Sequence, residues 1–282
     1  MKKYILDLTI RRTTAPRPGY VLLQLTDPTA PLPPMLPGQF VEVRVDGSPS
    51  TFLRRPISIN HVDRQANELW LLVHAVGDGT RTLATLREGD SVNVVLPLGR
   101  GFTLPKPQAG STDTGTSPQC DSDRTAQSEQ TAPQRYLLIG GGVGTAPLLY
   151  LGQTLAALGH RPTFLLGGRT SADLMQLELF RALGEVCITT EDGSTGERGF
   201  VTQHSLWQSA DTFSHICTCG PKPMMAAVAR LASEKGIDCE ASLENMMACG
   251  LGACLCCVED TVDGHVCVCK EGPVFNTNRL KW

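Results

Sequence analysis

The stretch that decides how this sequence is interpreted runs from residue 244 to residue 257 and reads ENMMACGLGACLCC. Within it, Cys249, Cys254 and Cys257 are spaced C-x4-C-x2-C, the spacing that provides three thiolates to a plant-type [2Fe–2S] cluster. Gly250 and Gly252 suit a loop around such a cluster, because glycine allows positive φ angles and close approach of the backbone. The spacing predicts an iron–sulfur module near the C-terminal end.

The identity of the fourth ligand and of the metal is left open by the spacing. Cys267 and Cys269 are two residues apart, so on a strand they would share one face, and Cys256 competes with its neighbour Cys257. Structural zinc also takes four cysteines, usually as two short pairs, and only one pair here is that short. We therefore favour an iron–sulfur cluster over zinc.

The composition restricts the class of protein. A chain of 282 residues can form two ordinary domains and a small module. The net charge of -3 argues against a nucleic-acid or anionic membrane surface, and no run reaches the ~18 apolar residues of a membrane span. The first residues lack the apolar core of a secretion signal. Eleven cysteines without such a signal indicate a reducing, cytoplasmic compartment.

The chain divides into four segments by composition and pattern. Residues 1–104 are β-rich and predict an antiparallel barrel or sandwich, with one short helix near residues 80–86. Residues 105–134 contain almost no residue able to fill a core and predict a polar, disordered linker or insertion. Residues 135–239 form a nucleotide-binding-type α/β segment, and residues 240–282 form the cluster module.

The α/β segment alternates strands and helices, which predicts a doubly wound parallel sheet. Its expected strands cover residues 136–139, 163–166, 186–189 and 215–219, and its expected helices cover residues 145–158, 172–183 and 223–235. The glycine-rich turn 140–144 separates the first strand from the first helix. Such a turn lets the backbone approach a pyrophosphate at a helix N-terminus. No acidic residue ends the second strand, where Arg169 follows Gly168, and this leaves open a reader of the 2′-phosphate of NADP.

Several motifs together resemble one known family. They are Arg55-Pro56-Ile57-Ser58, Gly79-Thr80, the turn from Gly140 to Pro147, and Cys219-Gly220-Pro221-Lys222-Pro223-Met224. In this order they are similar to the ferredoxin-NAD(P)H reductase superfamily. The cluster motif, with Ser242-Leu243-Glu244 before it and Cys269-Lys270-Glu271-Gly272-Pro273 after it, narrows the resemblance to the electron-transfer subunits of NAD-dependent dihydroorotate dehydrogenases. The resemblance covers nearly all of the chain except about residues 105–134.

The resemblance implies a set of ligand-binding residues. FAD would be held by Arg55, Pro56, Ile57, Ser58, Leu72, Val73, His74, Gly79 and Thr80. NAD would face Gly140, Gly141, Gly142, Val143, Gly144, Thr145, Cys219, Gly220 and Pro221, with Cys219 near the nicotinamide. The cluster would be held by Cys249, Cys254, Cys257 and Cys269. The wider superfamily has an aromatic residue at the position of Ile57, so flavin stacking would come from elsewhere.

The resemblance also implies a function in de novo pyrimidine (UMP) biosynthesis. Dihydroorotate would be oxidised at FMN in a separate catalytic subunit, and its electrons would pass through the cluster and FAD to NAD+. A heterotetramer of two plus two subunits is expected. After the predicted domains, no length remains for a (β/α)8 barrel of ~250 residues, so the chain would be one subunit. The same modules would serve a reductase subunit for ferredoxin, a hydrogenase or a sulfide-linked complex, and only the partner separates these alternatives.

Overall fold

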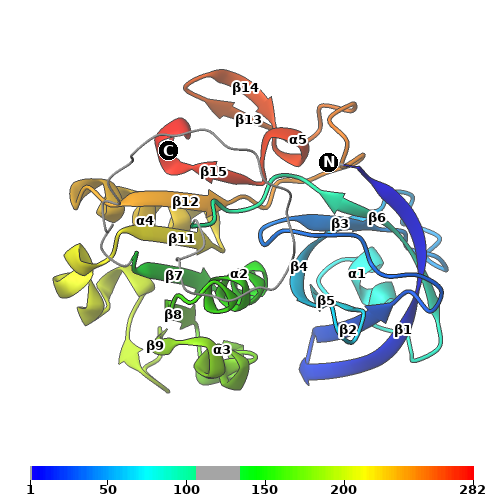
Figure 1. Cartoon of the computed structure of the whole chain (residues 1–282), viewed down its shortest axis with the longest axis horizontal. Helices are drawn as coiled ribbons and strands as arrows, with labels where there is room; N and C mark the ends of the chain where they lie inside the picture. Colours follow the sequence, from blue (N-terminus) through cyan, green and yellow to red (C-terminus); the bar gives the residue numbers. More distant parts are fainter. Residues whose placement is uncertain (1, 106–133) are drawn as a thin grey trace, which may run out of the picture.

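The computed structural model describes residues 2–105 and 134–282. They form a closed six-stranded barrel, a seven-stranded sheet with helices, and a separate two-stranded hairpin (Figure 1). This arrangement confirms the predicted antiparallel barrel and doubly wound sheet. The predicted polar insertion, residues 105–134, lies outside the described residues except for its two end residues.

The barrel has the strand order β1-β2-β5-β4-β3-β6, and all of its pairs are antiparallel. Alternating apolar side chains such as Val41, Val43, Leu69 and Leu71 fill its interior, where they are completely inaccessible to solvent. The elements are β1 (Tyr4–Arg17), β2 (Tyr20–Thr26), β3 (Phe40–Val43), β4 (Arg55–Asp63), β5 (Glu68–His74), α1 (Asp78–Leu83) and β6 (Ser91–Leu98).

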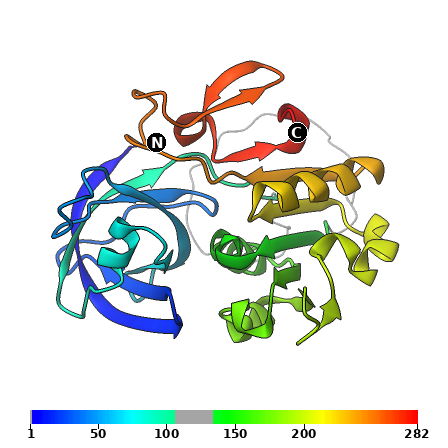
Figure 2. The same ribbon diagram turned by 180° about the vertical axis from the view of Figure 1, so that it is seen from behind.

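The second sheet has the order β10-β9-β8-β7-β11-β12-β15, with only β15 antiparallel to its neighbour. Leu148 and Phe180 pack on one face of it, and Val228 and Trp207 pack on the other, which makes the sheet doubly wound (Figure 2). Its strands are β7 (Tyr136–Gly141), β8 (Thr163–Gly168), β9 (Glu185–Thr190), β10 (Glu197–Arg198), β11 (His215–Cys219), β12 (Asp238–Ser242) and β15 (Val274–Asn276).

One predicted helix of the α/β segment differs clearly from the structure. The predicted helix 172–183 is wrong in its first half, where the short helix η2 (Ser171–Asp173) ends before α3 (Leu177–Leu183) begins. Gln176 between them is left-handed, with φ of 58°, and its amide bonds to Asn60 of the barrel. The other helices are η1 (Gly142–Thr145), α2 (Ala146–Ala157), η3 (Val201–Gln203), η4 (Ser205–Thr212) and α4 (Lys222–Glu234).

The C-terminal segment is anchored to both larger units. β12 ends beside β11, and a long loop then leads to the hairpin of β13 (Val258–Thr261) and β14 (Gly264–Cys267), followed by α5 (Val268–Glu271), β15 and η5 (Thr277–Arg279). An apolar cluster joins Phe40 and Leu98 of the barrel to Met225 of α4 and Phe275 of β15. The cysteine loop is therefore fixed to the barrel and the sheet together.

The barrel and the sheet also contact each other directly. The Tyr150 hydroxyl on α2 donates a hydrogen bond of 2.9 Å to the carbonyl of Met35. Asn60 and Gln176 exchange two amide hydrogen bonds of 3.1 and 2.9 Å. These buried polar contacts fix the relative orientation of the two units. Within the described residues, none of the helices has both the length and the apolar character that crossing a membrane requires.

Candidate functional site

The cysteine loop presents backbone N–H groups to its own sulfurs. Leu251 donates to Sγ of Cys249 at 3.3 Å, and Gly252 donates to Sγ of Cys269 at 3.1 Å. The N–H of Cys269 donates to Sγ of Cys257 at 3.3 Å. Such donors stabilise negative charge on sulfur and tune the potential of a bound cluster.

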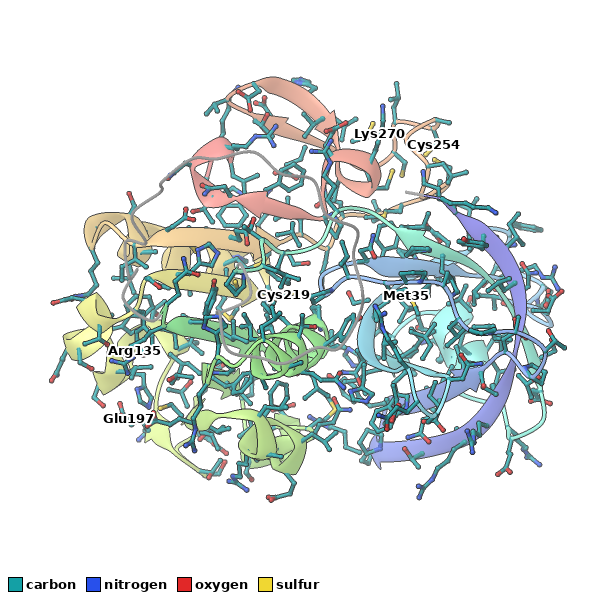
Figure 3. The ribbon with its side chains drawn as sticks, in the orientation of Figure 1. Met35, Arg135, Glu197, Cys219, Cys254 and Lys270 are labelled. Carbon is teal, nitrogen blue, oxygen red and sulfur yellow. The ribbon has the colours of Figure 1, made fainter. Side chains whose placement is uncertain are left out.

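Two cysteine pairs have different environments. Cys249 is half-buried, and Cys254 is exposed at the outside of the molecule (Figure 3). Desolvation alone would raise the pKa of Cys249, but N–H donors from Leu251 and Cys254 outweigh it and lower this pKa to about 6. Cys257 and Cys269 are both 2% exposed, and burial together with the neighbouring Cys257 raises the pKa of Cys269 to about 12. A bound metal would displace that proton.

Cys256 and Cys267, the alternative cluster ligands, lie in different surroundings from Cys257 and Cys269. Cys267 is the last residue of β14, whereas Cys269 lies in α5, so the two do not share a strand face as the spacing allowed. The Cys256 side chain is exposed, while its neighbour Cys257 is buried. Two of the three N–H donors described above are directed at Cys269 and Cys257, and the third is directed at Cys249.

A buried carboxylate lies beneath the loop. Glu42 on β3 is 1% exposed, and its two oxygens have no hydrogen-bond partner among the described residues. Burial raises its pKa to about 7, against the opposing influence of Arg54. A Cβ on Gly250, which has φ of +63°, would come within 2.7 Å of Glu42 Cγ. Glycine is thus required where the loop crosses the barrel.

The predicted flavin residues of β4 and α1 meet at one end of the barrel. Arg55 begins β4, and a Cβ on Gly79 would lie 2.8 Å from its Nε atom, so the guanidinium rests directly on this glycine. The Thr80 hydroxyl accepts hydrogen bonds from the N–H groups of Val76 and Gly77 at 3.1 and 3.0 Å. A guanidinium beside a tight turn can bind a diphosphate.

The remaining predicted flavin residues differ in the direction of their side chains. Ile57 packs against the barrel core, and Val73 is part of that core. Leu72 packs between the barrel and the sheet, with Ala146 and Met175. His74 instead stacks on Tyr20, with 4.1 Å between ring centroids and an interplanar angle of 4°. Pro56 and Ser58 are half-buried on β4.

A pocket of about 710 Å³ opens at the C-terminal edge of the parallel sheet. Of the predicted nucleotide-binding residues, Gly141, Gly142, Val143, Gly144, Gly220 and Pro221 line it, as do Tyr20 and His74 of the barrel. Gly140 and Thr145 are buried behind the turn, where a Cβ on Gly140 would meet Thr145 Cγ2 at 2.8 Å. The pocket therefore joins the glycine turn to the barrel face that carries His74.

Cys219 is buried near the centre of the molecule (Figure 3) and does not itself line the pocket, although Gly220, the next residue, does. Its Sγ is 3.9 Å from Oε1 of Glu244, which lines the pocket. Burial holds the pKa of the Cys219 thiol well above its usual value. The Glu244 side chain is open to solvent through the pocket, yet desolvation by its surroundings still raises the pKa of its carboxyl.

Glu191 is a pocket residue that sequence reasoning missed. It follows β9, and its N–H donates to the carbonyl of Gly168 at the end of β8. Glu191 and Arg169 consequently line the same part of the pocket. The prediction considered an acid only at the end of the second strand, but the third strand supplies one because the two strand ends are neighbours. An acid in this place can hold ribose hydroxyls.

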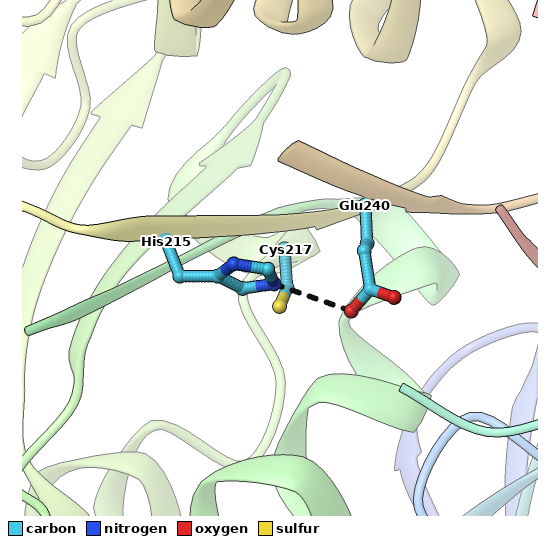
Figure 4. Close-up of side chains that lie close together, drawn as sticks. All are labelled: His215, Cys217 and Glu240. Atoms are coloured by element: carbon cyan, nitrogen blue, oxygen red, sulfur yellow. Dashed lines mark hydrogen bonds and ion pairs between the residues drawn. The ribbon is translucent and has the colours of Figure 1, made fainter. Parts of the chain in front are cut away.

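A polar cluster occupies the opposite, N-terminal end of the strands. His215, Cys217 and Glu240 place their potential ligand atoms within 4.8 Å of one another (Figure 4). The carboxylate of Glu240 also accepts hydrogen bonds from the N–H and the hydroxyl of Thr103 at 3.0 and 2.8 Å. His215 lies between Glu240 and Asp238, at 3.2 and 3.1 Å. These contacts provide hydrogen-bond partners for the buried carboxylate of Glu240, and they connect the end of the barrel segment to the sheet.

Comparisons with known proteins place the chain in a family. Residues 244–281 match the iron–sulfur cluster binding domain of dihydroorotate dehydrogenase B, and residues 138–230 match the oxidoreductase NAD-binding domain. Two relatives are named dihydroorotate dehydrogenase B (NAD(+)), electron transfer subunit. That of Shouchella clausii is 39% identical over 85% of this chain and 84% of its own. That of Lysinibacillus sphaericus is 40% identical over 86% and 85%.

Solved structures share the fold. The NADH-dependent reduced ferredoxin-NADP oxidoreductase structure has a TM-score of 0.79 and 24% identity, covering 98% of this chain and 90% of that one. Phthalate dioxygenase reductase has a TM-score of 0.59 and 23% identity, over 81% and 64%. Because it is 39–40% identical to the two relatives named above over more than four fifths of both chains, this chain belongs to the family of dihydroorotate dehydrogenase B (NAD(+)) electron transfer subunits.

Proposed function

We propose that this chain transfers electrons from dihydroorotate oxidation in a partner subunit to NAD+, in pyrimidine biosynthesis. One observation supports this most strongly. Glu244 lines the nucleotide pocket, and the cysteine loop begins only five residues later at Cys249. The segment that follows β12 therefore connects the two redox ends of the proposed path, which fits a relay better than two independent binding sites.

The family resemblance and the local geometry support the proposed ligand sets. The two pairs Cys249 with Cys254 and Cys257 with Cys269 would hold a binuclear cluster. Arg55, Gly79 and Thr80 would hold the FAD diphosphate, with Ser58 and His74 toward the flavin ring. The turn 141–144 with Gly220 and Pro221 would hold NAD. When bound, the cluster supplies one-electron steps, and the flavin exchanges both single electrons and hydride.

The pocket favours NAD over NADP in this proposal. The carboxylate of Glu191 can accept hydrogen bonds from ribose hydroxyls and would repel a 2′-phosphate. Arg169 is also in this part of the pocket, but its guanidinium would be shared with the acid beside it. Burial raises the pKa of the nearby Cys219 thiol, so this thiol adds no negative charge beside the pocket.

The partner we propose is an FMN-containing catalytic subunit, in a heterotetramer of two plus two. The outer face of the cysteine loop supports such a contact, because Met246, Leu251 and Leu255 are 84, 48 and 64% exposed. Apolar side chains beside an exposed cluster ligand suit a protein interface rather than water. Replacement of Leu255 by Asp should prevent co-purification of the partner and leave the iron content unchanged.

The cluster assignment is tested by single Cys→Ser variants. Variants at Cys249, Cys254, Cys257 and Cys269 should lose the visible iron–sulfur absorbance and the reduced-state EPR signal. Variants at Cys256 and Cys267 should retain both signals and serve as matched controls. The isolated chain should reduce dyes with NADH and fail to oxidise dihydroorotate. Turnover of dihydroorotate by the chain alone would contradict the proposal.

A further inference from the structure

An exposed apolar patch adjoins the proposed diphosphate site. Phe52 is 93% exposed, Leu53 is 50% exposed, and Val76 is 65% exposed. Single exposed apolar residues are ordinary, but three of them beside one binding site are not. The mechanism outlined above uses none of them.

The loop that carries Phe52 is held firmly against α1. The Ser50 hydroxyl donates to Asp78 Oδ2 at 2.9 Å, and the Ser48 and Thr51 hydroxyls are 2.8 Å apart. The guanidinium of Arg55 donates to the carbonyl of Leu53 at 3.1 Å. Phe52 therefore projects into solvent from a fixed backbone, which lowers the entropy cost of binding a ligand against it.

The position of Thr51 places the patch beside the diphosphate site. A Cβ on Gly79 would lie 3.0 Å from Thr51 Cγ2 and 2.8 Å from Arg55 Nε. Gly79 thus contacts the residue preceding Phe52 and the arginine at the same time. A molecule that binds a phosphate at Arg55 has its adjoining groups within reach of Phe52.

The covalent order of FAD determines which group reaches the patch. Its diphosphate separates the flavin ring and ribityl chain from the adenosine. In the proposed site the ring lies toward Ser58, three residues after Arg55, and Phe52 lies three residues before Arg55. On β4 the extended chain advances about 3.3 Å per residue, so Ser58 lies about 10 Å from Arg55, whereas Phe52 lies in the loop that precedes this strand. The adenosine consequently extends toward Phe52.

We propose that Phe52 stacks on the adenine of FAD, with Leu53 and Val76 at the margins of the contact. This inference rests on the proposed placement of the FAD diphosphate at Arg55. Stacking of a base on an aromatic ring strengthens its binding. Because the contact is open on one side, a Phe52→Ala change should weaken FAD binding by only about tenfold.

The test compares two flavins on the cluster-containing protein after removal of its FAD. Quenching of flavin fluorescence gives the Kd for FAD and for FMN, which has a phosphate and no adenosine. Phe52→Ala should raise the Kd for FAD about tenfold and leave that for FMN unchanged, whereas Phe52→Tyr should resemble the wild type for both. Ile5→Ala, which alters a residue of the same barrel that is 69% exposed, should change neither value.

Other outcomes would separate the possible errors. If Phe52→Ala affects both flavins equally, or neither, the stacking inference is wrong. If it preserves FAD binding and prevents co-purification of the catalytic subunit, the patch is a protein interface. Arg55→Ala should weaken both flavins. If Arg55→Ala changes neither Kd, the proposed diphosphate site itself is wrong, and this failure is distinguishable from that of the stacking contact alone.

Discussion

Gly144 provides a quantitative test of the nucleotide pocket. A Cβ at this position would lie 2.5 Å from the Cα atom of Gly220 and 2.6 Å from the carbonyl carbon and oxygen of Cys219. Ordinary contact begins at 3.4 Å, and the opposing atoms are backbone, which cannot rotate away. Gly144→Ala should therefore force the two pocket-lining turns apart by about 0.9 Å. Overpacking of this kind costs about 1–3 kcal/mol of folding free energy.

The effect on the NADH reaction should be comparable in free energy to the effect on stability. A displacement near 1 Å in a positioning element can reduce a rate about a hundredfold, so flavin reduction by NADH should slow by about ten- to a hundredfold. Anaerobic stopped-flow measurements of flavin bleaching against NADH concentration would give the apparent Kd and limiting rate. Gly159→Ala is the control, because Gly159 has φ of +86° with open space around it and should lose about 1 kcal/mol of stability only. NADH kinetics of Gly144→Ala within twofold of the wild type would refute the reasoning.

Three further predictions concern stability and specificity. Burial would raise the pKa of Glu240, but hydrogen bonds from His215 and Thr103 outweigh it and lower this pKa. The ionised carboxylate therefore stabilises the folded protein above the pKa of the unfolded state near 4.5. This stabilisation is lost as the pH falls through the lower pKa of the folded state. Urea unfolding of Glu240→Gln should accordingly show a weaker loss of stability below pH 4.5, and an unchanged pH profile would contradict this role. Asn60→Ala should cost about 2 kcal/mol by leaving the Gln176 amide unpaired, and a double-mutant cycle of the two should give coupling of at least 0.5 kcal/mol; additive effects would disprove the contact. Glu191→Gln should reduce the preference for NADH over NADPH about tenfold in dye reduction, and an unaltered ratio would exclude Glu191 from specificity.

Local sequence signals predicted most of the fold. The strand β11 was predicted with its exact bounds, because a short apolar run stands between a polar segment and the Gly220-Pro221 turn. The helix 172–183 failed because its break at Gln176 depends on a partner, Asn60, that is 116 residues distant in sequence. Pattern within a short window cannot detect such a tertiary contact.

Site prediction was limited in the same way. The spacing of Cys249, Cys254 and Cys257 is local and could be found directly, whereas the choice between Cys267 and Cys269 depended on where β14 ends and α5 begins. Glu191 could not be placed in the pocket without knowing that β8 and β9 are neighbours. The unpaired carboxylate of Glu42 has no sequence signal, because its burial depends on a loop more than 200 residues away.

The central claim is that this chain conducts electrons from dihydroorotate to NAD+ within a complex. The most direct measurement is anaerobic purification of the chain with its natural partner, followed by an assay of NADH formation at 340 nm after addition of dihydroorotate. The account predicts that an FMN-containing subunit co-purifies, that NADH forms, and that Cys269→Ser abolishes its formation while dihydroorotate still bleaches the FMN. A flavin-containing complex that remains inactive with dihydroorotate would contradict the account.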